Sequence, residues 1–179
     1  MARLVHGQLS SEGLAGGTAT VPSRGNRPCA ESTGRYGVGV TRLAAEIPAR
    51  DELLDLYGSV GWSVYTRDPE RLERALAGSG LVVTARDADG RLVGLVRTVG
   101  DGATICYLQD LVVRPDRQRG GVGRALVEHV RAAQPSGVLL VLTTDAGGTE
   151  DGDRSHPFYR SLGFAPHAEQ GLAAFSLRV

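Results

Sequence analysis

The chain has 179 residues, which is enough for one domain with a single core, and its 20 basic residues balance 20 acidic ones. Such a balance predicts neither a nucleic-acid partner nor attraction to an acidic membrane surface. All 20 basic residues are arginine, so a Walker-type phosphate loop, which needs a lysine, is excluded.

Cysteine usage and hydropathy limit the cofactors and the compartment. The two cysteines, Cys29 and Cys106, are far apart and unpatterned, so we expect neither a metal site nor a disulfide framework. No apolar run approaches the roughly 18 residues that a membrane span needs. Because the N-terminus lacks the apolar core of a secretory signal, the sequence predicts a cytoplasmic protein.

The first part of the chain divides into a tail and the start of a domain. Residues 1–36 are rich in Gly, Ser, Thr, Pro and Arg without any period, so we expect a flexible tail before a domain over residues 37–179. A strand is expected over residues 37–44, followed by a helix that begins near Pro48. A second helix opens at Asp68, with that carboxylate as N-cap and a proline at the first helical position.

Strand patterns follow these helices. Residues 81–86, 91–98 and 103–113 are separated by turns and predict an antiparallel meander. The apolar run 138–144 predicts a strand buried on both faces, reached from the meander by a right-handed parallel crossover. A short last helix and two closing strands about Gly171 complete an α/β domain with a mixed sheet.

The stretch VVRPDRQRGGVGRALVEHV, residues 112–130, joins the meander to an amphipathic helix. At a helix N-terminus, unpaired backbone N–H groups and the helix dipole favour an anion, and glycines let the anion approach closely. Gly120, Gly121 and Gly123 give that access. The stretch therefore predicts a phosphate or pyrophosphate site, with a glycine-rich loop that merely turns the chain as the alternative.

A dinucleotide-binding loop is a weaker interpretation of the same stretch. Leu126 stands where the fingerprint of such loops needs a third small residue. The six residues 114–119 ahead of the glycines also make a longer connection than that tight turn allows. The sequence therefore favours another kind of phosphate cradle.

Two motifs in this region resemble those of the GNAT N-acetyltransferase superfamily. Residues 118–123, QRGGVG, fit its Q/R-x-x-G-x-G/A acyl-CoA signature and follow a strand that ends in V-x-P. Residues 159–164, YRSLGF, fit its Y-x-x-x-G-F ending. The resemblance covers residues 37–179. It implies the GNAT fold, an α/β (α+β) domain with a mixed, mostly antiparallel sheet, a splayed parallel strand pair and helices on both faces.

The resemblance also implies an activity and a binding site. The protein is expected to move an acetyl group directly from acetyl-CoA, its co-substrate, to a primary amine without a metal. The loop would hold the pyrophosphate through backbone amides, and the strand before it would hold the pantetheine arm. The residues implied for acetyl-CoA are Leu111, Val112, Val113, Gln118, Arg119, Gly120, Gly121, Val122, Gly123 and Arg124.

Two residues are candidates for proton transfer. Tyr159 matches the family's usual proton donor to the departing thiolate. Asp110 lies in an apolar strand, where alternation turns it to the opposite face from Leu111, toward the cleft if a bulge intervenes. A carboxylate there is costly unless it is paired. Asp110 is therefore either a base or substrate anchor, or the structural partner of a nearby arginine or backbone amide.

The acceptor side is expected between the first two helices. Tyr57, Trp62 and Tyr65 gather aromatic side chains there and predict the wall of an amine pocket, with Trp62 as a plug under the loop as the alternative. The run VGW at residues 60–62 resembles a small GNAT subgroup that includes plastid-type enzymes acetylating arylalkylamines. A small-molecule amine is the preferred acceptor. A protein N-terminus or lysine, a non-catalytic acyl-CoA sensor and a homodimer are left open.

One segment departs from the family's pattern. Residues 145–158, DAGGTEDGDRSHPF, are longer and more acidic than the usual connection, and they lack the asparagine often found there. We expect a mobile, solvated loop, with an anionic lip that attracts a cationic amine as the alternative.

Overall fold

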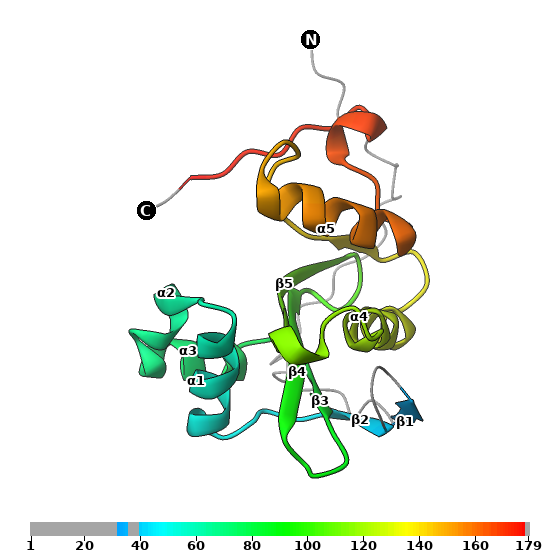
Figure 1. Ribbon diagram of the computed structural model, residues 1–179. Helices are drawn as coiled ribbons and strands as arrows, with labels where there is room; N and C mark the ends of the chain where they lie inside the picture. The colour runs from blue at the N-terminus through cyan, green and yellow to red at the C-terminus, as the bar shows by residue number, and fades with distance from the viewer. Residues whose placement is uncertain (1–31, 36–39, 178–179) are drawn as a thin grey trace, which may run out of the picture.

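A six-stranded sheet organises the computed structural model, which describes residues 32–35 and 40–177. The strands follow chain order, antiparallel from β1 to β5 and parallel between β5 and β6. Figure 1 shows α1, α2 and α3 on one side of the sheet and α4 on the other. The elements are β1 (Ser32–Arg35), β2 (Val40–Ala45), α1 (Arg50–Ser59), α2 (Ser63–Thr66), α3 (Pro69–Ala77), β3 (Leu81–Arg86), β4 (Leu92–Gly100), β5 (Ile105–Val113), the 3-10 helix η1 (Pro115–Arg117), α4 (Val122–Ala133), β6 (Leu139–Val141), α5 (Glu150–Ser161) and the 3-10 helix η2 (His167–Gln170).

Two apolar clusters cover the two faces of this sheet. The α4 cluster contains Leu126 and Val130 packed against β3, β4 and β5. The α1 cluster contains Leu53 and Leu76 of α1 and α3 packed against the opposite face. Gly94 in β4 lets α4 lie close, because an added Cβ would come within 3.1 Å of a Leu126 methyl. The predicted mixed sheet with helices on both faces is confirmed.

The sheet begins further upstream than the sequence indicated. Ser32–Arg35, placed in the expected tail, pair with β2 as strand β1. The strand expected over 37–44 is Val40–Ala45. The rest of the expected tail lies outside the described residues.

The meander and the second helix agree with the predictions. The three strands β3, β4 and β5 cover the predicted ranges to within two residues. Asp68 caps α3, since its carboxylate accepts a hydrogen bond of 2.9 Å from the Arg71 backbone N–H. Among the described residues, no helix is long and apolar enough to cross a membrane.

The parallel strand β6 is shorter and more open than predicted. It contains three residues instead of the run 138–144, and Leu139 is 55% exposed. The prediction that it is buried on both faces is wrong, because Leu139 is exposed and the other two residues of β6 are only half-buried.

The acidic connection, expected as a loop over 145–158, is largely helical. Helix α5 begins at Glu150, where Thr149 caps it by accepting a hydrogen bond from the Gly152 N–H at 3.1 Å. Its acidic first turn is favourable because carboxylates are attracted to the positive, N-terminal end of the helix dipole. The short last helix is therefore longer than expected, and Pro157 lies inside it at the loss of one backbone hydrogen bond.

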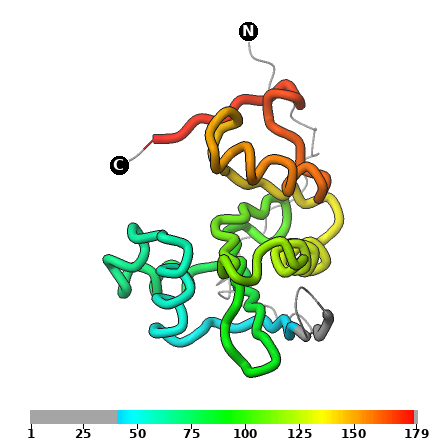
Figure 2. The backbone as a smooth tube through the Cα atoms, viewed as in Figure 1, coloured from blue at the N-terminus to red at the C-terminus, as the bar shows by residue number. Residues whose placement is uncertain are grey.

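The closing strands predicted about Gly171 are also wrong. The chain forms η2 and then an irregular segment to Leu177, drawn in red, that extends outward past α5 (Figure 2). Phe175 is 97% exposed in it. Alternating apolar residues form a strand only where a ladder partner is available, and the three-residue β6 offers little edge for one.

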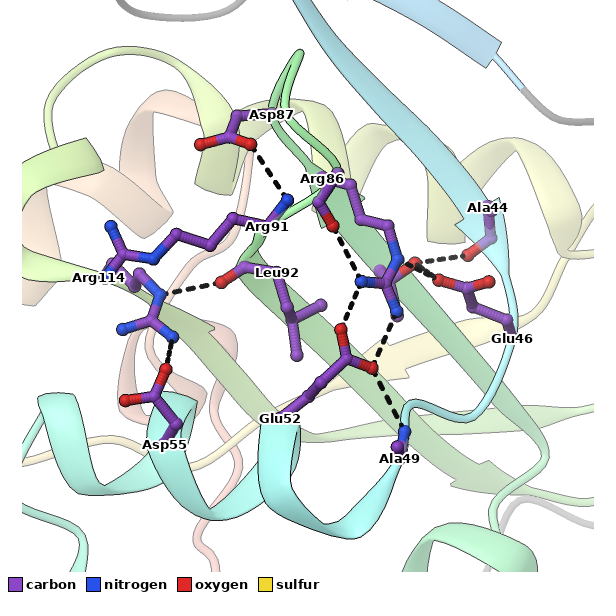
Figure 3. Close-up of polar contacts among 12 residues, drawn as sticks. Ala44, Glu46, Ala49, Glu52, Asp55, Arg86, Asp87, Arg91, Leu92 and Arg114 are labelled. Carbon is purple, nitrogen blue, oxygen red and sulfur yellow. Dashed lines mark hydrogen bonds and ion pairs between the residues drawn. The ribbon is translucent and has the colours of Figure 1, made fainter.

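Two arginines tie α1 to the sheet (Figure 3). Arg86 at the end of β3 binds Glu52 of α1 through two nitrogens, at 2.5 and 3.0 Å, and binds Glu46 at 2.7 Å. Arg114, after β5, donates to the Leu92 carbonyl at 2.7 Å and pairs with Asp55 of α1. These contacts fix the helix that carries Tyr57.

Candidate active site

A slot opens between the two parallel strands. β5 pairs with β6 only along Ile105–Tyr107, although β5 continues to Val113. Beyond Tyr107, alternate N–H and C=O groups of β5 therefore face the slot instead of a neighbouring strand. A cavity of about 530 Å³ lies here, and it is lined by Val60, Trp62, Leu111, Val112, Val113, Gln118, Arg119, Gly123, Thr144, Asp145, Asp151, Arg154, Ser155, Phe158 and Tyr159.

The glycine loop lies at one end of this slot. Gly121 is the N-cap of α4 with φ 88°, a left-handed conformation that favours glycine. The first hydrogen bond within the helix runs from the Ala125 N–H to the Gly121 carbonyl at 2.9 Å. The three preceding N–H groups of α4 thus have no partner within the helix. A Cβ at Gly121 would have nothing within 4 Å, so the backbone there is open to a ligand.

These features fit the diphosphate of a CoA thioester. Anions bind at helix N-termini through unpaired amides and the dipole. Arg119 lines the cavity, and Gln118 donates to the Val113 carbonyl at 3.0 Å, which holds the loop against the end of β5. The cavity continues along β5 from this loop toward Tyr159.

Six of the ten residues predicted for acetyl-CoA line the cavity with their own atoms. Two of the others have side chains engaged elsewhere: Val122 is buried in the α4 cluster, and Arg124 bonds Ser161 Oγ at 2.8 Å. Gly120 and Gly121 are backbone positions of the loop itself. Any contribution of these four to acetyl-CoA is therefore through the backbone.

Tyr159 lies along the wall of the slot opposite β5. It is half-buried and packs edge-on against Phe158 and Phe164, with ring centroids 5.1 and 5.9 Å apart. Burial raises the pKa of Tyr159, so the phenol remains protonated at neutral pH. It also lines a second cavity of about 510 Å³ beside β6.

A bulge in β5 sets the direction of Asp110. The ladder with β4 skips Gln109, because Leu108 and Asp110 pair with consecutive residues of β4. An extra residue reverses the face that later side chains take. Leu108 thus packs in the α4 cluster, whereas Val112 packs in the α1 cluster. Asp110 points to the α1 side, where the cavity does not reach it.

Asp110 is 2% exposed and accepts three hydrogen bonds there. One oxygen accepts from the Tyr65 hydroxyl at 2.8 Å, and the other accepts from the Tyr57 hydroxyl at 2.9 Å and from Arg97 Nε. Of the two roles left open for Asp110, this geometry favours the partner of an arginine. Arg97 itself escaped notice in the sequence, although an arginine inside an apolar strand was the available signal.

The three aromatic residues expected at the acceptor side form one cluster. Trp62 stacks on Tyr65 with centroids 5.8 Å apart, and Tyr57 contacts both rings. Of these three aromatic residues, Trp62 alone lines the cavity, and the nearby Val60 lines it as well. Tyr57 is fully buried and Tyr65 is half-buried, so the prediction that they contact the acceptor is corrected: they lie behind Trp62.

Charged residues of the 145–158 segment lie at the same cavity. Asp145 and Asp151 line it from the α5 side, and Arg154 lies with them, 3.5 Å from Asp151. The sequence indicated the acidic pair but not Arg154. Trp62 and these charged residues thus line one and the same cavity.

A mixed sheet with a short parallel pairing of β5 and β6, and a glycine N-cap of α4 beside it, is the arrangement that the resemblance to the GNAT superfamily implies. The family model of the acetyltransferase (GNAT) domain matches residues 78–166. A GNAT-family acetyltransferase from Streptococcus pneumoniae superimposes with a TM-score of 0.66 at 31% identity, over 78% of this chain and 98% of that one.

Curated sequences agree. Serotonin N-acetyltransferase 2 of rice chloroplasts is 34% identical over 70% of this chain and 62% of its own length. A ycf52-like N-acetyltransferase of Prochlorococcus marinus is 32% identical over 69% and 67%. The chain thus spans less than two thirds of the rice protein. It belongs to the GNAT family of acetyltransferases, whose members use acetyl-CoA as co-substrate.

Proposed function

We propose that the protein is an N-acetyltransferase that moves an acetyl group from acetyl-CoA directly to the primary amine of a small cationic molecule. The observation that carries this proposal is one continuous slot. The amides of α4 that have no partner within the helix lie at one end of this slot. Tyr159, Trp62, Asp145 and Asp151 line the same cavity.

Each part of the slot has a role in this reaction. Acetyl-CoA supplies an activated thioester and a thiolate leaving group. The α4 amides and Arg119 bind the diphosphate, and those backbone groups of Leu111–Val113 that β4 and Gln118 leave free orient the pantetheine arm and hold the acetyl oxygen. The ammonium of the acceptor first loses a proton to water, and the free amine then attacks the thioester carbonyl. Tyr159, protonated because burial raises its pKa, donates a proton to the departing sulfur as the C–S bond breaks, and the second proton lost by the nitrogen restores the phenol.

The acceptor side suggests the kind of amine. Trp62 offers an aromatic face, and Asp145 and Asp151 place negative charge in the same cavity, which Arg154 offsets only in part. An alkyl ammonium on an aromatic skeleton satisfies both features. A relative named for serotonin acetylation is consistent with that choice. We therefore rank arylalkylamines first among acceptors.

An acceptor panel tests the proposal. Purified protein and acetyl-CoA are mixed with arylalkylamines, aliphatic diamines and peptides carrying a lysine or a free N-terminus, and CoA release is measured. The chain has no lysine, so side-chain self-acetylation adds no background. We expect the arylalkylamines to react fastest. Acetyl-CoA binding without turnover of any acceptor would indicate a sensor, and turnover of peptides alone would indicate a protein acetyltransferase.

Tyr159→Phe tests the proton donor. It should lower kcat by about 10²–10⁴-fold and leave acetyl-CoA affinity unchanged. Tyr107→Phe is the matched control. It also removes a phenol hydroxyl, which lies 2.5 Å from Thr143 Oγ1, and Tyr107 does not line the cavity of about 530 Å³. Equal kcat in both variants would remove Tyr159 from the mechanism.

A further inference from the structure

We infer that Asp110 is a positioning residue for the acceptor: held in place by Arg97, it fixes Tyr57 and Tyr65, and through them the Trp62 wall of the cavity. The inference rests on the proposed function and adds to it the residue that sets acceptor affinity. It assigns Asp110 no proton transfer.

The first step is that Asp110 is buried, that both of its oxygens already accept hydrogen bonds, and that it does not line the cavity. The Tyr57 hydroxyl and Arg97 occupy one of its oxygens, and the Tyr65 hydroxyl occupies the other. A base must reach the proton that it abstracts, directly or through one water. The neighbouring residues Leu111 and Val112 line the cavity, but Asp110 does not.

The second step is that the carboxylate joins elements that are far apart in the sequence. Tyr57 belongs to α1 and lies 53 residues before Asp110 in the sequence. Tyr65 belongs to α2 and lies 45 residues before it. Arg97 comes from β4 across the bulge. Helix α2 has four residues and none of them is fully buried, so the Tyr65 bond to Asp110 contributes to holding it in place.

The third step links this network to the cavity. The Tyr65 ring stacks under Trp62 at an interplanar angle of 28°, and the Tyr57 ring meets Trp62 edge-on at 5.9 Å. Trp62 is 37% exposed and lines the cavity. A shift of either tyrosine therefore moves the indole against which an acceptor would rest.

The groups that face Asp110 keep their protonation states across the working pH range. Burial and the Asp110 charge raise the pKa of both Tyr57 and Tyr65, so both remain hydroxyl donors. Burial opposes the charge of Arg97, but the adjacent carboxylate outweighs it and the pKa of the guanidinium is raised. The network is consequently a fixed support and no switch.

Two variants and a control test the inference. Tyr65→Phe deletes one hydroxyl and leaves the Arg97–Asp110 pair intact, which makes it the decisive variant. Asp110→Asn leaves the Arg97 charge without its partner and lowers stability, so its fold is checked by thermal unfolding. Tyr107→Phe again serves as the control. Trp62 is the only tryptophan of the chain, so its emission and acrylamide quenching report the wall directly.

For Tyr65→Phe we expect stronger quenching of Trp62 and a rise of about tenfold in KM for the amine. KM for acetyl-CoA and the acidic limb of the kcat/KM pH profile should stay as in the native protein. Asp110→Asn should show the same split between the two substrates. The control should match the native protein throughout.

Other results overturn the inference. Unchanged Trp62 quenching in Tyr65→Phe shows that the wall does not depend on this network. A fall in kcat of about 10²-fold in Asp110→Asn, with the acidic limb lost and amine KM unchanged, identifies Asp110 as the base. The quenching needs no turnover. If the native protein acetylates no amine, the proposed function fails while the quenching still decides the role of the network.

Discussion

The two halves of the slot are built in different ways. The half that we propose for acetyl-CoA is formed by backbone: an N-cap in the left-handed region, three amides without a partner within the helix and the free edge of β5. The half that we propose for the acceptor is formed by side chains: Trp62 packs on Tyr57 and Tyr65, and both tyrosines donate hydrogen bonds to Asp110.

Because of this difference, the two halves of the slot should respond differently to side-chain substitutions. The backbone amides of a helix start attract a diphosphate without requiring a particular set of side chains, so the half proposed for acetyl-CoA depends mostly on glycines and a helix start. The acceptor half depends on contacts between α1, α2, β4 and β5, and one altered side chain can reshape it. We expect substitutions in one half to leave binding in the other nearly unchanged.

The largest effect is expected from Gly121→Glu. A side chain at φ 88° is strained by roughly 1–2 kcal/mol, and a carboxylate at this helix start repels the diphosphate. Acetyl-CoA binding measured by calorimetry should weaken by at least about 100-fold, in line with the loss of several charge-assisted bonds. Trp62 quenching should not change.

Gly102→Glu is the control for that variant. Gly102, at φ 71° in the turn between β4 and β5, is also open to solvent, so it carries the same strain and charge away from the slot. It should bind acetyl-CoA normally. A Gly121→Glu protein with native affinity would contradict the placement of the diphosphate.

The glycine loop and the start of α4 were predictable because their signals are local. The glycines, the amphipathic helix and the preceding apolar strand are contiguous within residues 112–130, and the observed α4 begins where they indicate. The partners of Asp110 are not local. Nothing in the sequence near Asp110 specifies two tyrosines about 50 residues away, and the bulge at Gln109 that turns it toward them has no signal of its own.

The errors in the fold have the same origin. Pro157 is a helix start by local rules, yet the Thr149 cap and the acidic first turn begin α5 earlier. The closing segment has strand alternation, but a strand needs a neighbour, and the sequence does not state how short β6 is.

A smaller effect is expected from Trp62→Leu. Loss of the aromatic face should raise KM for an arylalkylamine about tenfold and should affect an aliphatic amine less. KM for acetyl-CoA should stay within about twofold if the halves are independent. Steady-state kinetics with both amines provide the measurement.

Val64→Ala is the matched control for Trp62→Leu. Val64 is an exposed apolar residue of α2, the short helix whose N-cap is Trp62, and it does not line the cavity. If both variants changed the two amines alike, Trp62 would be a plug of the loop and the acceptor would rest elsewhere.

The smallest effect concerns the support of the acceptor half, and Glu52→Gln addresses it. The Arg86 hydrogen bonds hold the pKa of Glu52 below its ordinary value, so the pair stabilises the fold above that value. The contribution is lost as pH falls through the lowered pKa. At pH 7 the variant should be less stable by about 0.5–1 kcal/mol, since the pair is partly exposed.

The control is Glu150→Gln, because Glu150 also lies in the first turn of a helix and pairs with an arginine, at 2.7 Å, on the open surface. Urea unfolding at pH 7 and about pH 3 should show a stability difference for Glu52→Gln that narrows at the lower pH. Acetyl-CoA affinity should stay constant, because α1 supports Tyr57 and not the glycine loop. If Glu52→Gln lowered the free energy of unfolding equally at both pH values, the carboxylate charge of Glu52 would contribute nothing to stability. The pair of Arg114 with Asp55 would then be the charged contact that holds α1 to the sheet.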